Sequence, residues 1–409
     1  MKIKVGVLFG GKTVEHEISI ISAIQAMGYL DTNKYDVIPI YITKNNEFYV
    51  GEKVGKIESY TDINTLIKNS QRVIMVRDDN KVNLIKYPQK MFSKGVVDYI
   101  DIAFPIVHGT NVEDGTLQGF LKMFNIPYVG CDVLSSAVGM DKYVMKTVLK
   151  DNGIPVLDCK CYTAKQYDEN EEAIIEEIEK VIGYPLIVKP VNLGSSIGIS
   201  KAENRTELYD SLDTAFRYAT KVLVETAVQN LKEINCSVLG DYEEAEASEC
   251  EEPVSSDKIL TFAEKYIGDG SSKGAKGGVK SSPSGSKGMA TLKRKIPADI
   301  TAEQRDTIRE LAVKAFKCLG CGGVSRIDFM MDTKTGNIWL NEINTIPGSL
   351  SFYLWEPIGV KYTELLDRMI SLALKREREG ENITYTFDSN VLQGVKLGGG
   401  TKGAKGTKA

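Results

Sequence analysis

The stretch Ser325-Arg-Ile-Asp-Phe329, together with Trp339-Leu-Asn-Glu-Ile-Asn-Thr345, decides the fold of the C-terminal half of the chain. In both segments apolar residues alternate with polar ones, and this alternation predicts two β-strands. Side chains two residues apart on a strand point to the same face. Each segment therefore presents its polar side chains on one face.

The two strands are expected to pair as a hairpin through Asp332-Thr-Lys-Thr-Gly336. One face of that hairpin then carries a guanidinium, two carboxylates and an amide, from Arg326, Asp328, Glu342 and Asn344. Hard oxygen ligands of this kind suit Mg²⁺, which proteins usually hold with one or two carboxylates plus substrate phosphates. The alternative is a surface hairpin with a solvated polar face. The segment that follows, Asn-Thr-Ile-Pro-Gly348, is more typical of a site-forming loop than of a simple turn and favours the metal site.

The composition is that of a globular protein with two or three domains, because the chain has 409 residues, of which 42% are hydrophobic and 26% charged. A net charge of −4 gives no electrostatic reason to expect nucleic-acid binding. The chain has no apolar run of membrane-spanning length, and its start does not resemble a signal peptide, so we expect a cytoplasmic location without membrane insertion. The seven cysteines follow no disulfide pattern and are expected to be reduced.

The N-terminal region is predicted to begin with a strand, a helix and a second strand, at Lys2–Phe9, Val14–Leu30 and Tyr35–Thr43. This order is typical of a parallel sheet. A further strand is expected at Val97–Val107, followed by a helix at Gly115–Phe124.

A new unit is expected to begin near Asp141 and to mix helices with strands. Its predicted elements are the helices Lys142–Asn152, Glu171–Ile182 and Glu207–Ala219 and the strands Pro185–Lys189 and Lys221–Glu225. Strands dominate from Ile234 onward, and long helices are expected at Thr301–Leu319 and Lys361–Arg378. The segment Gly268–Gly288 and the last residues, Gly398–Lys408, are rich in Gly and Lys and are expected to be flexible.

Two glycine-rich segments are candidates for phosphate binding. Gly6-Val-Leu-Phe-Gly-Gly-Lys-Thr13 fits the P-loop expression, but Gly6 lies inside the strand rather than at its end, so we interpret the match as false. Ile187–Gly198 is the stronger candidate, because a strand delivers Lys189 to a loop of glycines and serines whose backbone N–H groups can surround an oxyanion. The alternative for this segment is a hairpin turn with an exposed lysine.

Both histidines of the chain lie beside glycine turns in the N-terminal region. Glu15 and His16 follow the turn at Gly10-Gly11, and His108 follows a predicted strand, where open α/β sheets place their ligands. A single histidine is usually a satisfied polar group, so this signal is weak by itself.

Six motifs occur in the order seen in D-alanine–D-alanine ligases, which belong to the ATP-grasp superfamily, and the chain resembles that family over residues 1–375. They are Phe9–Ser19, the His108 segment, Met140-Asp-Lys142, the Lys189 segment, Arg326-Ile-Asp328 and Asn341–Gly348. The resemblance implies an α/β ATP-grasp fold of three α/β domains at residues 1–140, 141–229 and 230–378, with a flexible tail at 379–409. It also implies a homodimer, with ATP and two Mg²⁺ ions (or Mn²⁺ in their place) between the central and C-terminal domains.

The resemblance further implies a role for each matching residue. The ATP-binding residues are Lys142, Lys189, Ser195, Ser196, Glu225, Glu233 and Lys265, and the metal ligands are Asp328, Glu342 and Asn344. The groups at the reacting centre are Glu15, Ser195, Tyr266, Arg326 and the Gly348 backbone, and the amino-acid substrates are expected at Glu15, His108, Ser351 and Tyr353. Lys265-Tyr266 and the segment after them resemble the loop that closes over the site.

The reaction implied is ATP-dependent ligation of two D-amino acids, in which one carboxylate becomes an acyl phosphate and the second amine displaces phosphate. Its expected product is D-alanyl-D-alanine for peptidoglycan. Positive charge, Mg²⁺ and positioning supply most of the catalysis in such chemistry.

Three departures from the family pattern bear on the second substrate. Val112 replaces a glycine, Phe262 stands where a tyrosine is common, and Ser349–Trp355 replaces a run that normally gives a hydroxyl to the second carboxylate. Ser351 or Tyr353 is expected to take over that hydroxyl. D-alanine is the leading second substrate, ahead of D-serine, D-lactate or another amino acid. A catalytically silent nucleotide-binding regulator is the alternative from another class of protein.

Overall fold

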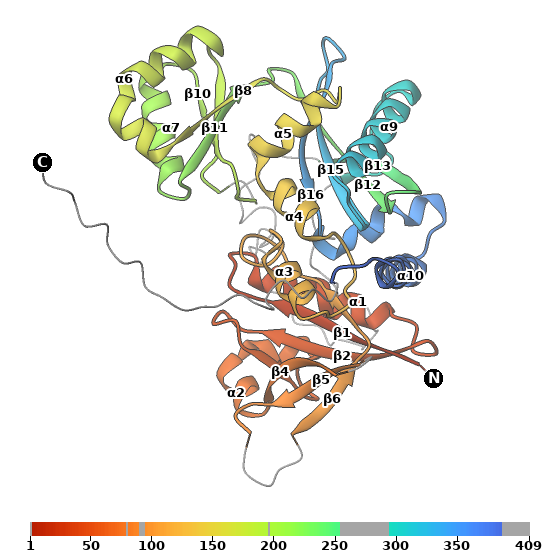
Figure 1. Ribbon diagram of the computed structural model, residues 1–409. Helices are drawn as coiled ribbons and strands as arrows, with labels where there is room; N and C mark the ends of the chain where they lie inside the picture. The colour runs from red at the N-terminus through yellow and green to blue at the C-terminus, as the bar shows by residue number, and fades with distance from the viewer. Residues whose placement is uncertain (1, 79–80, 90–94, 195–196, 254–293, 387–409) are drawn as a thin grey trace, which may run out of the picture.

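Three β-sheets, each covered by helices, make up the computed structural model, which describes residues 2–78, 81–89, 95–194, 197–253 and 294–386. In Figure 1 the N-terminal sheet lies at the bottom, the central sheet at the upper left and the C-terminal sheet at the upper right. None of the helices in this described part of the chain is long and apolar enough to cross a membrane. All seven cysteines are free thiols, as the sequence predicts.

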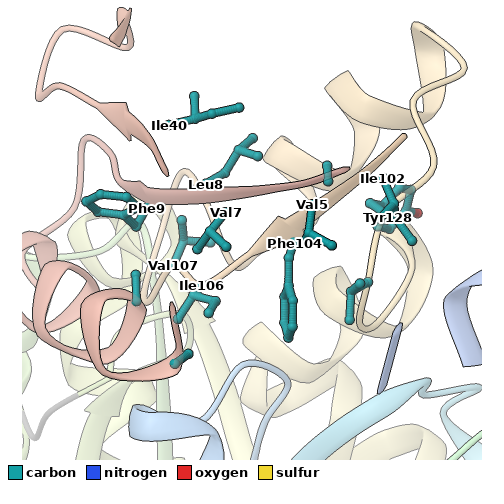
Figure 2. Close-up of a cluster of buried hydrophobic side chains, with 14 of the residues drawn as sticks. Val5, Val7, Leu8, Phe9, Ile40, Ile102, Phe104, Ile106, Val107 and Tyr128 are labelled. Carbon is teal, nitrogen blue, oxygen red and sulfur yellow. The ribbon is translucent and has the colours of Figure 1, made fainter. Parts of the chain in front are cut away.

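The N-terminal sheet has seven strands in the order β6-β5-β4-β3-β2-β1-β7. Its elements are β1 (Ile3–Gly10), α1 (His16–Tyr29), β2 (Tyr35–Ile42), β3 (Phe48–Val50), η1 (Ile57–Thr61), α2 (Ile63–Lys68), β4 (Gln71–Asp78), β5 (Lys81–Lys86), β6 (Val96–Ile100), β7 (Ile102–Pro105) and α3 (Thr116–Met123). The predicted parallel pairing is confirmed for β1, β2 and β7, whereas the remaining strands pair antiparallel. Figure 2 shows the apolar side chains of β1 and β7 that form the buried core on this sheet, among them Val5, Leu8 and Phe104.

The prediction of one continuous strand at Val97–Val107 is wrong. The chain forms two strands there, β6 and β7, which pair with β5 and β1 at opposite edges of the sheet. Asp101 separates them: its backbone N–H donates to the Lys4 carbonyl at 2.8 Å, and its carboxylate accepts from the Lys4 N–H at 2.8 Å. The sheet is therefore curled, because a single residue carries the chain from one edge to the other.

The central sheet has four antiparallel strands in the order β10-β9-β11-β8. Its elements are β8 (Cys159–Thr163), α6 (Ala164–Val181), β9 (Leu186–Pro190), β10 (Ser200–Ala202), α7 (Arg205–Phe216) and β11 (Lys221–Thr226). Helix α6 begins before the predicted Glu171, because Thr163 and Gln166 form a capping box that starts the helix there. The backbone departs from helical geometry at Asn170, close to the predicted start.

Of two short helices, α4 (Val133–Met140) lies beside the C-terminal sheet above α3, and α5 (Lys142–Asp151) lies between the central and C-terminal sheets (Figure 1). Asp141 caps α5 by accepting the N–H groups of Tyr143 and Val144. Helix α5 contributes Met145 and Leu149 to the core of the C-terminal sheet. This placement brings the first turn of α5 next to the central strands.

The C-terminal sheet has five strands in the order β14-β13-β12-β15-β16. Its elements are β12 (Leu231–Gly240), β13 (Ala245–Pro253), β14 (Arg294–Lys295), α9 (Ala302–Cys318), β15 (Gly323–Asp332), β16 (Ile338–Asn344), η3 (Gly348–Leu354), η4 (Glu356–Ile358) and α10 (Tyr362–Glu381). One face packs against α9 through apolar residues such as Ile327 and Phe329. The opposite face carries the polar residues predicted from the sequence.

The loop after β16 is held at its far end by Trp355, which is fully buried. Its indole N–H donates to the Ser237 hydroxyl at 3.1 Å, and that hydroxyl donates to the Ser325 carbonyl at 3.0 Å. These bonds tie η3 to β12 and β15 of the C-terminal sheet. The near end of the loop contacts helix α1 and the loop after β7 instead, so it joins the N-terminal part of the molecule to the C-terminal sheet.

Candidate active site

The predicted hairpin is confirmed, and its register places the polar residues together. In the antiparallel pair β15–β16, Arg326 lies opposite Asn344 and Asp328 lies opposite Glu342, so all four share one face. The Arg326 guanidinium donates two hydrogen bonds of 2.7 Å to the Asp328 carboxylate, which also accepts from the Asn344 amide at 3.1 Å. Burial alone would lower the pKa of Arg326, but the charge and hydrogen bonds of Asp328 outweigh it and raise the pKa well above its ordinary value.

A second group of charges lies where the central sheet meets β16. Glu225 on β11 contacts two lysines, Lys146 from α5 and Lys189 from β9, the latter at 2.5 Å. The three residues are between 2% and 4% exposed, so these charges are desolvated. Burial raises the pKa of Glu225, but the charges of Lys189 and Lys146 outweigh it and hold the pKa below its ordinary value.

Lysines of β9 and α5 also contact the C-terminal sheet. Lys189 donates to the Asn341 side chain at 3.0 Å, and Lys142 contacts the Glu342 carboxylate at 3.1 Å. Lys142 also donates to the Leu193 carbonyl at 2.9 Å, at the start of the glycine-rich loop. Burial lowers the pKa of Lys189 more than the nearby Glu225 raises it. Ammonium groups of α5 and β9 therefore lie against polar side chains of β16.

Two loops of the N-terminal sheet complete the site, and Glu15 lies at the junction between them. Glu15 precedes the first residue of α1 and is 8% exposed. Gly109 has a φ of +85°, and a β-carbon there would lie 2.5 Å from the Thr13 hydroxyl and 2.9 Å from the Glu15 carboxylate. Only glycine allows this close approach.

His108 supports the loop after β16. Its Nδ1 lies 2.8 Å from the Ile346 carbonyl, and its Nε2 lies 3.0 Å from the Ser22 hydroxyl. Burial lowers the pKa of His108 more than the charge of Glu15 raises it, so the ring is neutral. Nδ1 therefore donates to the carbonyl, Nε2 accepts from Ser22, and the Ser22 oxygen accepts the Ser349 N–H at 3.0 Å.

Glu113 links the loop that contains Gly109 to the loop after β16. One oxygen accepts the Ile346 N–H at 2.8 Å, and the other accepts the Gly109 N–H at 2.9 Å. Burial raises the pKa of Glu113 to about 8, although both backbone hydrogen bonds act in the opposite direction. Glu113 thus fixes the loop that leads to Gly348 against the N-terminal sheet.

The loop itself contains a left-handed turn built from three residues that are not glycine. Ser349, Leu350 and Ser351 have φ values of 51°, 53° and 51°, a conformation that costs free energy for each residue. The Ser351 hydroxyl is buried and finds no hydrogen-bond partner among the residues that the structure describes. The Tyr353 hydroxyl donates to the Glu251 carboxylate at 3.2 Å.

Comparison with known proteins decides the family. The family models described as "D-ala D-ala ligase N-terminus" and "D-ala D-ala ligase C-terminus" match residues 4–131 and residues 148–282 and 285–371. A D-alanine–D-alanine ligase of Thermosipho melanesiensis is 39% identical over 396 residues, covering 97% of this chain and 99% of the relative. A ligase of the same name from Geobacillus thermodenitrificans is 38% identical and covers 95% and 100%. The chain belongs to the D-alanine–D-alanine ligase family.

Solved structures of this family have the same fold. The D-alanine–D-alanine ligase of Coxiella burnetii matches with a TM-score of 0.74 and 29% identity, over 93% of this chain and 96% of that one. The VanG D-Ala:D-Ser ligase of Enterococcus faecalis matches with the same TM-score and 34% identity, over 91% and 100%. The predicted ATP-grasp α/β fold is therefore confirmed.

The structure brings most of the candidate residues of this family member together. Lys142, Lys189 and Glu225 meet beside the face that carries Arg326, Asp328, Glu342 and Asn344. Glu233 is exposed on β12, farther along the strand that faces β15. Four candidates lie outside the described residues, namely Ser195, Ser196, Lys265 and Tyr266, and so do the segments at 268–288 and 398–408.

Two further residues with clear structural roles were not assigned a role from the sequence. Lys146 is one, although it follows Lys142 by four residues and so lies on the same face of α5, which was a usable signal. Glu113 is the other, and its burial between distant loops leaves no local pattern in the sequence.

The donor set fits Mg²⁺ that is bound partly by substrate. Asp328 and Glu342 are carboxylates on one face, and hard cations such as Mg²⁺ take few protein oxygens when phosphates supply the rest. Across the described ranges, no three His, Cys, Asp or Glu side chains form a cluster that could hold a metal ion by themselves.

We predict that Lys146→Met destabilises the protein by about 3–5 kcal/mol, because it leaves the buried Glu225 with one cationic partner fewer. The control is Lys150→Met, one turn along α5, whose lysine and Asp158 partner are 67% and 85% exposed. That change should be nearly neutral, since exposed ion pairs contribute little. Urea unfolding followed by circular dichroism measures both, and equal midpoints would contradict the prediction.

We also predict that Glu113→Gln destabilises the protein by about 1–3 kcal/mol, because an amide offers one acceptor for two backbone N–H donors. The effect should depend on pH. The folded state holds the proton of Glu113 up to a pKa of about 8, above the ordinary value of 4.5. The stability that this proton confers is complete below pH 4.5 and is lost as the pH rises to about 8.

The difference in unfolding free energy between wild type and Glu113→Gln should therefore narrow across that pH range. The exposed Glu303→Gln serves as the control and should show no such trend. A difference that stays constant with pH would refute the assignment of a raised pKa to Glu113.

Proposed function

We propose that the protein joins two D-amino acids at the expense of ATP, with D-alanyl-D-alanine as the product. The family membership supports this, since relatives of the same length carry the name D-alanine–D-alanine ligase. The observation that supports the proposal is the contact of Lys142 with Glu342 and of Lys189 with Asn341, since these lysines are proposed to bind phosphate and Glu342 to bind metal. The product is a building block of peptidoglycan, which places the protein in cell-wall synthesis.

In this proposal the ATP phosphates lie between two lysines, Lys142 and Lys189, and the polar face of β15 and β16. Lys142 and Lys189 bind phosphate oxygens, and Glu225 and Glu233 bind the adenosine part. Asp328, Glu342 and Asn344 hold divalent cations, which neutralise phosphate charge when bound. Ser195, Ser196 and Lys265 are further ATP-binding residues in this proposal.

The chemistry follows from the residues around that space. Glu15, with His108 beside it, holds the ammonium group of the first amino acid. The carboxylate of that amino acid attacks the γ-phosphate of ATP, which gives an acyl phosphate and ADP. The amine of the second amino acid then attacks the acyl carbon, and the oxyanion that forms is stabilised by Arg326 and the Gly348 N–H. Phosphate then leaves, and Tyr266 is a further residue proposed for the reacting centre.

A D-serine acceptor is the second candidate. One solved structure with 34% identity to this chain is that of a D-Ala:D-Ser ligase, and the loop at Ser349–Trp355 departs from the common family pattern. The first substrate and the phosphate chemistry are the same in both candidates.

The assembly proposed from the resemblance is a homodimer, which light scattering of the purified protein would test.

The function is tested with purified protein, ATP and MgCl₂ and a panel of amino acids. We expect D-alanine alone to support release of ADP and formation of dipeptide, and L-alanine to support neither. D-serine and D-lactate added to limiting D-alanine identify the second substrate by mass spectrometry of the product. Phosphate release that no amino acid stimulates would contradict the proposal and favour a nucleotide-binding regulator.

We predict that Glu342→Gln lowers amino-acid-dependent ADP release by about a hundredfold or more, the size expected when one charged group of a preorganised site is lost. The fold should persist, because the side chain keeps its shape and lies on the polar face. Circular dichroism checks the fold, and the exposed Glu364→Gln is the matched control. Undiminished ADP release by Glu342→Gln would refute its role as a metal ligand.

A further inference from the structure

Tyr353 is held in a fixed place by bonds at both ends of its loop. The Ser349 N–H donates to Ser22 of the N-terminal part, and Trp355 donates to Ser237 of the C-terminal sheet. Between these anchors the left-handed turn at Ser349, Leu350 and Ser351 reverses the chain. A strained turn kept between two anchors is typical of a segment that positions a functional group.

The Tyr353 side chain packs into a charged cluster formed with Glu251, Arg294 and Asn235. Its hydroxyl donates to one oxygen of Glu251, which also accepts from the Asn235 amide at 3.0 Å. The other Glu251 oxygen contacts the Arg294 guanidinium at 3.2 Å, and that guanidinium lies 4.0 Å from the centre of the Tyr353 ring. A carboxylate and an aromatic face thus fix the guanidinium from two sides.

This cluster continues the row of polar residues that carries the metal-binding groups. Strands β13, β12, β15 and β16 lie side by side in the sheet (Figure 1). Across them Glu251 lies opposite Asn235, Asn235 opposite Asp328, and Asp328 opposite Glu342. Arg294 on β14 lies opposite Pro253, which is two residues along β13 from Glu251. Residues two apart on a strand share a face, so Arg294 lies on the same face as this row, at the edge of the sheet.

The two hydroxyls expected to bind the second carboxylate differ in their surroundings. The Ser351 hydroxyl is buried and has no hydrogen-bond partner among the described residues, and the Tyr353 hydroxyl donates to Glu251. Burial raises the pKa of Tyr353 to about 12, so the phenol keeps its proton and remains a donor to that carboxylate. The second amino acid still brings a negative charge that needs a cation.

Arg294 is the better placed of two guanidinium groups to supply that cation. Arg326 is engaged by Asp328 through two short hydrogen bonds. The Arg294 side chain is 15% exposed, whereas that of Glu251 is 5% exposed, so a ligand can reach the arginine while its support stays buried. A guanidinium can serve two carboxylates at once, because its N–H donors form a planar fork.

We infer that Arg294, held in position by Glu251 and Tyr353, binds the carboxylate of the second amino acid. The inference rests on the proposed ligase function and names the group that recognises its second substrate. Glu251 is a positioning residue, since it acts through Arg294. In this chain a guanidinium therefore does the work that a hydroxyl does in the usual family pattern.

A competition between two acceptors tests the inference directly. The protein is given ATP, MgCl₂ and D-alanine together with D-alaninamide, which lacks the acceptor carboxylate, and the two dipeptide products are measured by mass spectrometry. Wild type should prefer the acid over the amide. In Arg294→Met the acid-to-amide ratio should fall about tenfold to a hundredfold, the range expected for the loss of one charged hydrogen-bonded contact. The ratio is independent of how much protein is active, so partial misfolding does not imitate this result.

Three further variants test whether the charge and the shape of Arg294 set the acid-to-amide ratio. Arg294→Lys should recover part of the preference, because it restores the charge without the planar fork. Glu251→Gln should lower the ratio less than Arg294→Met. The control is Lys295→Met, which removes a neighbouring exposed charge from the same strand and should leave the ratio unchanged.

The outcomes separate this inference from the function on which it depends. If wild type forms no dipeptide, the proposed function fails. If wild type forms dipeptides and Arg294→Met keeps the wild-type ratio, the inference alone is wrong. An equal fall in Lys295→Met would also overturn it, because the effect would then be one of general surface charge.

Discussion

The register between β15 and β16 is the constraint on which the site depends. Opposite pairing of Asp328 with Glu342 gathers the charged side chains on one face and leaves Ile327 and Phe329 for the core beneath α9. A slip of one residue would exchange these two faces and bury the charges. The cost of burying unpaired charge is much larger than any gain from an alternative pairing, so the register is strongly specified.

The other parts of the molecule hold the segments that extend from this sheet. Glu113 and His108 fix the loop after β16 from the N-terminal side, through the backbone of Ile346. Lys142 and Lys189 reach β16 from the opposite side. The positions of Gly348 and of the acidic face therefore depend on contacts from all three sheets, and a change in any of them would be felt at the site.

Local patterns in the sequence were sufficient where a structure depends on near neighbours. The β15–β16 hairpin and helices α1, α5, α9 and α10 follow from alternation, helical periodicity and capping residues, and the structure confirms them. The break at Asp101 was missed because it depends on Lys4, which is distant in sequence and adjacent only after the sheet curls. The surrounding apolar run gave no local sign of it.

The same distinction between local patterns and distant contacts applies to the candidate site. Motif order pointed to Asp328, Glu342, Lys142 and Lys189, whose roles in the reaction are proposals that the structure makes geometrically consistent. The cluster of Glu251 and Arg294 could not be predicted, because its members come from three strands and the loop after β16 and meet only through pairing across the sheet. The left-handed turn at Ser349 was equally unpredictable, since serine has no preference for that conformation.

The ion pairs of the buried lysines affect which anions the proposed site can bind. Lys189 and Lys142 are buried and already contact carboxylates in the absence of a nucleotide. In the proposed complex the phosphates compete with Glu225 and Glu342 for these ammonium groups, rather than with bulk solvent. A singly charged anion gains little by displacing a carboxylate of equal charge, whereas a triphosphate brings several charges at once. In the proposed complex these ion pairs would therefore favour binding of a polyanion over that of a singly charged anion.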